Sequence, residues 1–215
     1  SSTATVLVGG ETGVGKELFA RAIHYNGERR SRPFIPINCS ALPDHLFENE
    51  VFGHVRGAYT DAGSAAKGLL GEAEGGTVFF DEIDTLSSAA QAKMLRLVQD
   101  REYRPLGSSK TLVADTRVVA ATNQPLEQAV RDGRFRRDLF FRLQVGEIRV
   151  PAFRERQTDR PLLATHFLRK VGCEQGRRVR HFTAAAAEDA RAVNARGEGR
   201  QRAHVDGGRP PVGGG

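Results

Sequence analysis

The sequence has few cysteines, which stabilise small secreted domains, and no long apolar run of the kind that anchors a protein in a membrane. Its 215 residues include no tryptophan, one methionine and two cysteines, Cys39 and Cys173, which lack the short spacing of a metal site. The longest apolar runs are about four residues, against the ~20 that a membrane-spanning helix needs. The first residues carry neither a basic nor an apolar export segment. We therefore expect a cytoplasmic protein with no membrane partner.

The remaining composition is typical of a globular chain, with 39% hydrophobic and 27% charged residues. A length of 215 residues is enough for one domain with a sizeable hydrophobic core and a small second domain. Residues 126–215 carry 19 Lys and Arg against 11 Asp and Glu, which is compatible with a nucleic-acid face. Several of these arginines, however, fall in a motif that has another explanation. The chain begins without methionine, one strand before its first motif, so we expect it to be a fragment.

The clearest motif lies between an apolar run at residues 5–8 and a helical pattern that starts at Leu18. Gly10, Gly13 and Gly15 predict positive φ angles that turn N–H groups toward an anion, and the helix adds its positive dipole end. Lys16, directly after Gly15, completes the G-x-x-x-x-G-K pattern of a phosphate-binding loop. A turn that is glycine-rich by chance is the alternative, but strand, helix and lysine all stand where phosphate binding requires them. The predicted ATP-binding residues are Gly10, Glu11, Thr12, Gly13, Val14, Gly15, Lys16 and Glu17.

Glu17 stands where such a loop usually has the Ser or Thr that holds Mg²⁺, so the metal must depend on a carboxylate elsewhere. Residues 75–84 predict a buried strand that ends in Asp81 and Glu82, at the edge of a parallel sheet where α/β folds bind ligands. We expect Asp81 to bind Mg²⁺, directly or through water, and Glu82 to polarise the water that attacks the γ-phosphate. A helix N-cap followed by a first-turn acid is the alternative explanation.

Three more segments carry candidate residues. Residues 118–123 predict a core strand, after which Asn123 would sense the γ-phosphate or position water, although capping the next turn explains it equally well locally. Residues 135–143 are basic and aromatic, and Arg136 and Arg142 would bind phosphate across a subunit boundary; a solvated helix face is the alternative that local sequence favours. Residues 53–63 predict a surface loop whose exposed aromatic suits contact with a partner.

Other patterns outline the rest of the fold. Residues 33–39 predict a strand whose prolines indicate a sheet edge or a strand start. Residues 40–52 have helical spacing, with Pro43 and Asp44 suited to the first turn. Helices are also predicted from Ser87 or Ser88 to about Gln99 and over 159–171, with a hairpin or excursion at 101–117.

In this order the motifs resemble the AAA+ ATPase domain of bacterial enhancer-binding proteins, the activators of sigma-54 RNA polymerase. The resemblance runs from about Val6 to about Ala186. Gly15-Lys16-Glu17 matches the family's Gly-Lys-Glu, Phe80-Asp81-Glu82 its Walker B motif and Ala121-Thr122-Asn123 its sensor one. The loop Gly57, Ala58, Tyr59, Thr60, Asp61, Ala62 resembles the GAFTGA loop that contacts sigma-54.

The resemblance implies an α/β fold: a P-loop AAA+ three-layer sandwich with a parallel central sheet over residues 1–150, plus a truncated helical lid over 151–186. It also implies a hexameric ring that binds ATP and Mg²⁺ between subunits and hydrolyses ATP to drive the loop against the sigma-54 RNA polymerase holoenzyme, opening promoter DNA. Asn38 would pair with Glu82 as a switch, and Arg136 and Arg142 would be finger arginines. DNA would be bound through a domain that is not in this chain.

The sequence departs from the family in the loop and at its end. Tyr59 and Asp61 replace a Phe and a Gly, and Arg160 replaces an apolar lid residue, while Thr60 is kept. After residue 182 there is no Leu, Ile, Met, Phe, Tyr or Trp, and the lid's Gly-Asn-Val-Arg-Glu-Leu motif is missing. We expect residues 187–215 to be a disordered or aberrant tail, and hypothesise that it is out of frame; genomic DNA with no other frame encoding the lid would contradict this.

Two alternative functions follow from these departures. A nucleotide-binding regulator with little turnover is one, because the lid is incomplete. The other is an AAA+ module that acts on a partner other than sigma-54, because Asp61 adds charge and stiffness to the loop.

Overall fold

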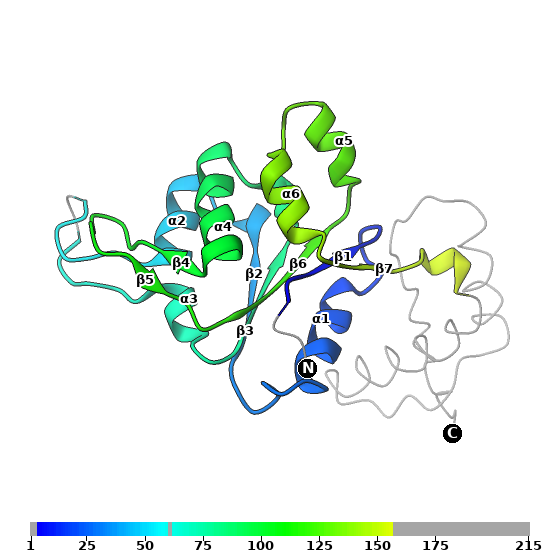
Figure 1. The fold of residues 1–215 in the computed structure, drawn as a ribbon, viewed down its shortest axis with the longest axis horizontal. Helices are drawn as coiled ribbons and strands as arrows, with labels where there is room; N and C mark the ends of the chain where they lie inside the picture. The colour runs from blue at the N-terminus through cyan, green and yellow to red at the C-terminus, as the bar shows by residue number, and fades with distance from the viewer. Residues whose placement is uncertain (1–3, 60–61, 157–215) are drawn as a thin grey trace, which may run out of the picture. The chain divides into compact units, whose positions relative to one another are not determined.

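The computed structural model describes residues 4–59 and 62–156, which form an α/β unit around a five-stranded parallel sheet (Figure 1). The strand order is β2-β3-β6-β1-β7, and each pair of neighbours is parallel. The strands are β1 (Val6–Gly9), β2 (Phe34–Asn38), β3 (Thr77–Asp81), β6 (Arg117–Thr122) and β7 (Gly146–Arg149). The strands predicted from the sequence are confirmed as β1, β2, β3 and β6, whereas β7 is not among them. Strand β2, with its Pro36, lies at the edge of the sheet, one of the two places that its prolines indicated.

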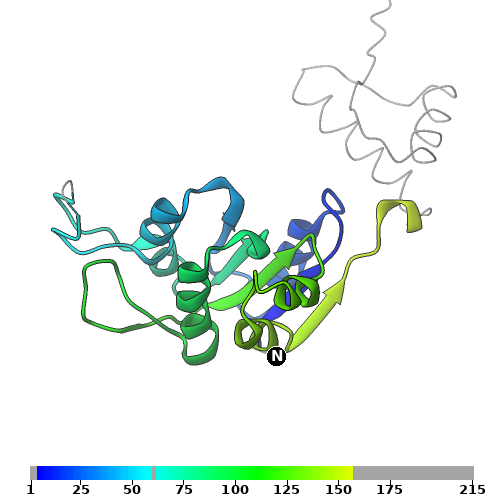
Figure 2. The same cartoon turned by 90° about the horizontal axis from the view of Figure 1, so that it is seen from above.

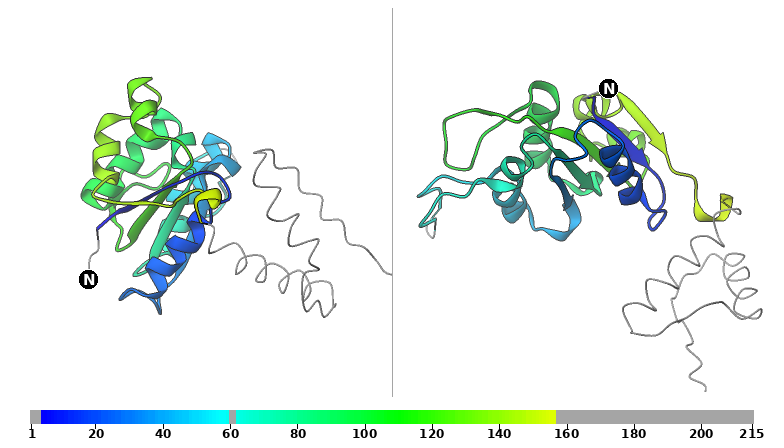
Figure 3. Two further views of the ribbon diagram at one scale, coloured as in Figure 1. Left: turned by 90° about the vertical axis from the view of Figure 1, so that its right-hand side faces the viewer. Right: turned by 90° about the horizontal axis from the view of Figure 1, so that it is seen from below.

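Successive side chains of the sheet enter two different cores, because neighbouring residues of a strand point to opposite faces. Phe79 and Val8 pack with Ala20 of helix α1 (Lys16–Tyr25), whereas Phe80 and Leu7 belong to the larger core on the other face. That larger core includes residues of α2 (Asp44–Phe52), α3 (Gly68–Glu72), α4 (Ser88–Asp100), α5 (Leu126–Arg131) and α6 (Arg137–Leu143). Figure 3 shows α1 and the α4–α6 group on opposite sides of the sheet. The predicted three-layer sandwich is therefore confirmed.

Helix starts follow local chemistry. Ser87 precedes α4 and its Oγ accepts a hydrogen bond from the Ala90 N–H at 3.4 Å, as expected of an N-cap. Helix α2 begins at Asp44, in agreement with the predicted first turn at Pro43 and Asp44, and the residues before it form a separate 3-10 turn at Cys39–Ala41 that Asn38 caps. The short helices α3 and α5 are not predicted by the sequence pattern, since five or six residues hardly show a 3.6-residue period.

A hairpin projects from the sheet unit, as predicted for residues 101–117. Its strands β4 (Glu102–Tyr103) and β5 (Leu112–Val113) are antiparallel. The loop around residues 53–66 runs beside it: the Leu106 N–H donates to the Gly53 carbonyl at 2.8 Å, and the Val55 N–H to the Leu106 carbonyl at 3.1 Å. Figure 2 shows the two segments projecting together at one end.

Several predictions fall outside the described residues. These are Thr60 and Asp61 of the loop, Arg160, the helix at 159–171, the rest of the lid and the tail. Within the described part, the chain ends after β7 in a 3-10 turn, η3 (Phe153–Glu155). None of the helices described is long and apolar enough to cross a bilayer.

Candidate functional site

The glycine-rich loop connects β1 to α1 at the carboxyl edge of the sheet. Gly13 and Gly15 have φ angles of 80° and 92°, which side-chain-bearing residues rarely adopt. The prediction of a positive φ at Gly10 is wrong. Gly10 is instead required by crowding, because a Cβ there would lie 2.9 Å from the Val150 carbonyl oxygen, where the chain leaves β7.

Lys16 closes this loop from the first turn of α1. Its side chain is buried, and Nζ donates to the carbonyl oxygens of Gly10 at 3.0 Å and Glu11 at 3.1 Å. An ammonium group beside a glycine-shaped loop and a helix N-terminus suits the oxygens of a phosphate chain. The residues present therefore fit the β- and γ-phosphates of a nucleotide.

Asp81 ends β3, separated from β1 by β6. Burial raises the pKa of Asp81 above its usual range, and the carboxylates of Glu82 and Glu17 add to this, while the Glu82 N–H and the Lys16 ammonium oppose it. The Glu82 N–H donates to Asp81 Oδ1 at 3.0 Å. A half-buried carboxylate beside other acids is stabilised by a cation, so Asp81 suits a Mg²⁺ ion.

Glu82 adopts an unusual backbone conformation. Its φ of 55° and ψ of 46° lie in the left-handed region, which costs a residue with a side chain about 1–3 kcal/mol and is common at functional sites. The Thr85 hydroxyl donates to the Glu82 carbonyl at 2.8 Å, within the 3-10 turn η2 (Ile83–Thr85). Since the Glu82 side chain does not cap this turn, the N-cap alternative gains no support.

The two asparagines differ in their surroundings. Asn123 follows β6 and its Nδ2 lies 3.4 Å from Thr12 Oγ1, while its Oδ1 is buried without a hydrogen-bond partner in the described structure. Thr122, not Asn123, bonds the next turn, because the Gln124 N–H donates to Thr122 Oγ1 at 3.2 Å. Asn38 lies opposite Asp81 in the β2–β3 register, but its Oδ1 accepts from the N–H and hydroxyl of Ser40, each at 2.9 Å. Its pairing with Glu82 stays a prediction.

Arg142 of α6 and Arg136, the residue that precedes this helix, line different hollows. Arg136 is exposed, forms a 2.7 Å ion pair with Asp138 and lines an open hollow with Phe141. Arg142, also exposed, lines another hollow with Val145. Within residues 4–59 and 62–156, neither arginine is hydrogen-bonded to the loop at residues 10–17. The structure thus brings Lys16, Asp81 and Asn123 to one edge and leaves both arginines elsewhere.

Two ion pairs at this edge are not among the contacts predicted from the sequence. Arg154 forms a bidentate ion pair with Glu11, at 2.7 and 2.8 Å, which lowers the pKa of Glu11. Glu17 pairs with Arg21 at 2.7 Å along the exposed face of α1. An i,i+4 spacing could have revealed the second pair, whereas the partners of the first are 143 residues apart.

Comparison with known proteins identifies the family. The Sigma-54 interaction domain family matches residues 1–149. The chain is 45% identical over 204 residues to the transcriptional regulatory protein GlrR of Escherichia coli (strain K12), covering 95% of this chain and 46% of GlrR. It is 51% identical over 174 residues to the Nif-specific regulatory protein of Azotobacter vinelandii, covering 81% and 33%. The chain thus spans less than half the length of these two relatives.

The fold is also that of solved relatives. A crystal structure of NtrX from Brucella abortus superposes with a TM-score of 0.80 and 33% identity, covering 88% of this chain and 43% of that one. NtrX in complex with ADP gives a TM-score of 0.79 and 32% identity, covering 89% and 42%. With a family match over most of its length and this sheet order, the chain belongs to the Sigma-54 interaction domain family and has the AAA+ ATPase fold.

Proposed function

We propose that this chain is the ATP-hydrolysing, sigma-54-contacting module of a transcriptional activator. The observation that carries the proposal is that Lys16, Asp81 and Asn123 follow or end β1, β3 and β6, three strands that adjoin in the sheet. Its relatives include transcriptional regulators, and NtrX has been crystallised with ATP and with ADP.

Each residue has a role in phosphoryl transfer to water. The N–H groups of residues 10–16 and the Lys16 ammonium bind the phosphates, and Asp81 would hold Mg²⁺. When bound, Mg²⁺ neutralises charge that develops on the phosphate oxygens. Glu82 accepts a hydrogen bond from the attacking water and takes its proton. Asn123, beside Thr12, orients that water, and Asn38 restrains Glu82 when it turns from Ser40.

Arg136 and Arg142 complete a site on a neighbouring subunit. Both lie on or next to α6, without a hydrogen bond to the loop of their own chain, and both are exposed. A guanidinium supplied in trans stabilises the transition state, worth about 10³–10⁵ in kcat in related chemistry. This requirement makes the active form a ring, for which we propose six subunits, in the cytoplasm.

The loop at residues 57–62 contacts sigma-54 RNA polymerase holoenzyme. Among its described residues, Tyr59 is 44% exposed and its ring lies 5.2 Å from that of His54. An exposed aromatic with one supported face is suited to a protein contact. Binding of DNA is assigned to a domain outside this chain.

The first test is ATP turnover per chain as a function of protein concentration, for the natural sequence and for Lys16→Ala. We expect turnover to rise steeply with concentration and to vanish in the variant. Nucleotide binding without turnover at any concentration would favour a regulator with an incomplete lid.

Mixing two inactive variants tests the trans arginines. Lys16→Ala chains keep their arginines and Arg136→Ala chains keep their loop, so a mixed ring contains complete sites. Turnover that returns on mixing supports the proposal; no return, with both variants folded, contradicts it. Sigma-54 binding with ADP and aluminium fluoride tests the partner, and no binding would favour a different one.

A further inference from the structure

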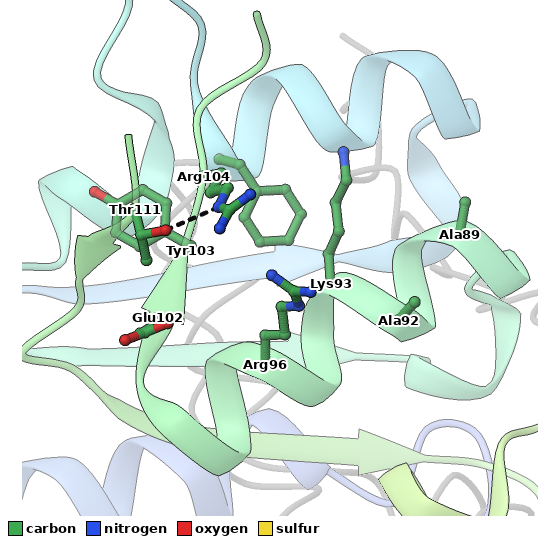
Figure 4. Close-up of a pocket in the computed structure, with 9 residues that line it drawn as sticks. Ala89, Ala92, Lys93, Arg96, Glu102, Tyr103, Arg104 and Thr111 are labelled. Carbon is green, nitrogen blue, oxygen red and sulfur yellow. Dashed lines mark hydrogen bonds between the residues drawn. The ribbon is translucent and has the colours of Figure 1, made fainter. Parts of the chain in front are cut away.

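A pocket lies between α4 and the β4–β5 hairpin (Figure 4). It is separate from the sheet edge with Lys16, Asp81 and Asn123 that we propose to bind nucleotide (the nucleotide edge). Its volume is about 290 Å³, at the small end of ligand sites. Phe52, Ala89, Ala92 and Tyr103 provide its apolar lining. None of the residues proposed for ATP hydrolysis lines it.

The rim of this pocket carries more positive than negative charge, because Lys93, Arg96 and Arg104 line it together with one carboxylate, Glu102. Lys93 is neutralised by Glu48 at 2.6 Å, but within the described residues no ion pair involves Arg96 or Arg104. Arg104 Nε donates to the neutral Thr111 hydroxyl at 2.8 Å, which orients the guanidinium without cancelling its charge. Figure 4 shows Arg96 extending from α4 and Arg104 from the segment that follows β4.

These surroundings define the chemistry of a ligand. Guanidinium groups bind carboxylates in planar, two-point arrangements, and the aromatic rings of Phe52 and Tyr103 in the lining favour a flat apolar body. We propose that this pocket binds a small aromatic carboxylate, with the ring against Phe52 and Tyr103 and the carboxylate on Arg96 and Arg104.

Such a ligand would join α4 to the hairpin. Leu106 of the hairpin connection exchanges hydrogen bonds with Gly53 and Val55, at the base of the loop at residues 57–62 that we propose to contact sigma-54 (the contact loop). A ligand that holds the hairpin against α4 therefore restrains that loop and changes its affinity for sigma-54. This second step rests on the proposed function, whereas binding of the ligand does not.

The test uses the 215-residue chain and 2-naphthoate as the probe, followed by ligand-observed NMR without nucleotide. With about 13 heavy atoms, the probe should bind with a Kd of about 1 mM. Ala92→Leu, which fills the pocket from an already partly exposed helix position, should abolish binding. Arg96→Ala should weaken it about tenfold. Lys110→Ala, an exposed cation of the same hairpin that does not line the pocket, should leave it unchanged.

Two results would overturn the site. One is equal binding of 2-naphthoate and the uncharged 2-naphthamide, and the other is undiminished binding to Ala92→Leu with its fold intact by circular dichroism. Coupling between the pocket and the contact loop is then measured as the change in sigma-54 affinity on adding 2-naphthoate to the natural chain and to Ala92→Leu. A response in the natural chain alone supports coupling, and equal responses contradict it. Failure of sigma-54 to bind at all counts against the proposed function, not against the pocket.

Discussion

The nucleotide edge and the contact-loop region are built in different ways. At the nucleotide edge, Lys16, Asp81 and Asn123 sit at the ends of buried parallel strands, so the sheet itself sets their spacing. The base of the contact loop is held by backbone hydrogen bonds of Gly53 and Val55 with Leu106 and of His54 with Ala66, and Tyr59 is exposed. A site fixed by strand ends and a loop held only at its base suit the proposed function, in which the loop has to move while the site stays in place.

This difference predicts that each region can be damaged without the other. A change at the nucleotide edge should stop turnover while the loop stays in place. A change at the hairpin should weaken the partner contact and leave turnover intact.

The largest effect is expected from Arg142→Ala. Because a trans arginine supports transition-state charge, kcat should fall about 10³-fold or more with nucleotide binding little changed. Steady-state ATP turnover at ring-forming concentration measures this. Arg131→Ala, an exposed arginine at the end of α5, is the matched control and should retain turnover. A similar loss in both variants would contradict the assignment.

Glu82→Gln should reduce kcat about 10²–10⁴-fold, the range for losing a general base. The amide keeps the shape of the side chain, so ATP affinity and thermal stability should stay close to those of the natural chain. Turnover and nucleotide titration on the same sample check this. Unchanged turnover would remove Glu82 from the mechanism.

Gly107→Ala disturbs the contact between the hairpin and the contact loop. Gly107 has a φ of 73°, and a Cβ there would lie 2.8 Å from the Ala58 Cβ of the contact loop. We expect sigma-54 affinity to fall about tenfold, or about 1.4 kcal/mol, at normal ATP turnover. Gly133→Ala is the control, because it has a φ of 71° and no atom within 4 Å of the added Cβ. It shares the backbone strain of about 1–2 kcal/mol but not the clash, so equal effects would argue against the hairpin's role.

The smallest effect concerns stability against pH. Burial lowers the pKa of His24 below its usual value of 6.5, with the charge of Arg117 adding to this. The unfolded chain therefore takes up a proton near pH 6.5 while the folded chain resists it, so stability is full above that pH and decreases as pH falls.

The urea midpoint measured between pH 7.5 and 5.5 should fall more for the natural chain than for His24→Gln. Glutamine does not titrate and can still bond the Thr77 hydroxyl, which His24 Nδ1 meets at 2.9 Å. Identical slopes would show that His24 does not contribute.

Much of the fold and of the nucleotide edge is encoded locally. The strand before Gly10, the helix after Lys16, the acids that end β3 and the N-cap at Ser87 are all evident from neighbouring residues. The carboxyl ends of parallel strands lie at one edge of a sheet. Short-range patterns were therefore enough to predict that Asp81 and Asn123 lie on the same edge as the glycine-rich loop at residues 10–17. The tyrosine-bearing loop and the hairpin were recognised by the same kind of signal.

Only the tertiary structure decided which distant groups meet. Glu11 finds Arg154 across 143 residues, and Gly10 is crowded by Val150 rather than bent into a positive φ. The pocket between α4 and the hairpin also has no local signature, since its two walls are shaped by how the helix and the β4–β5 pair pack. Backbone preference and hydrophobic period act over a few residues, whereas these contacts depend on how the finished layers close against one another.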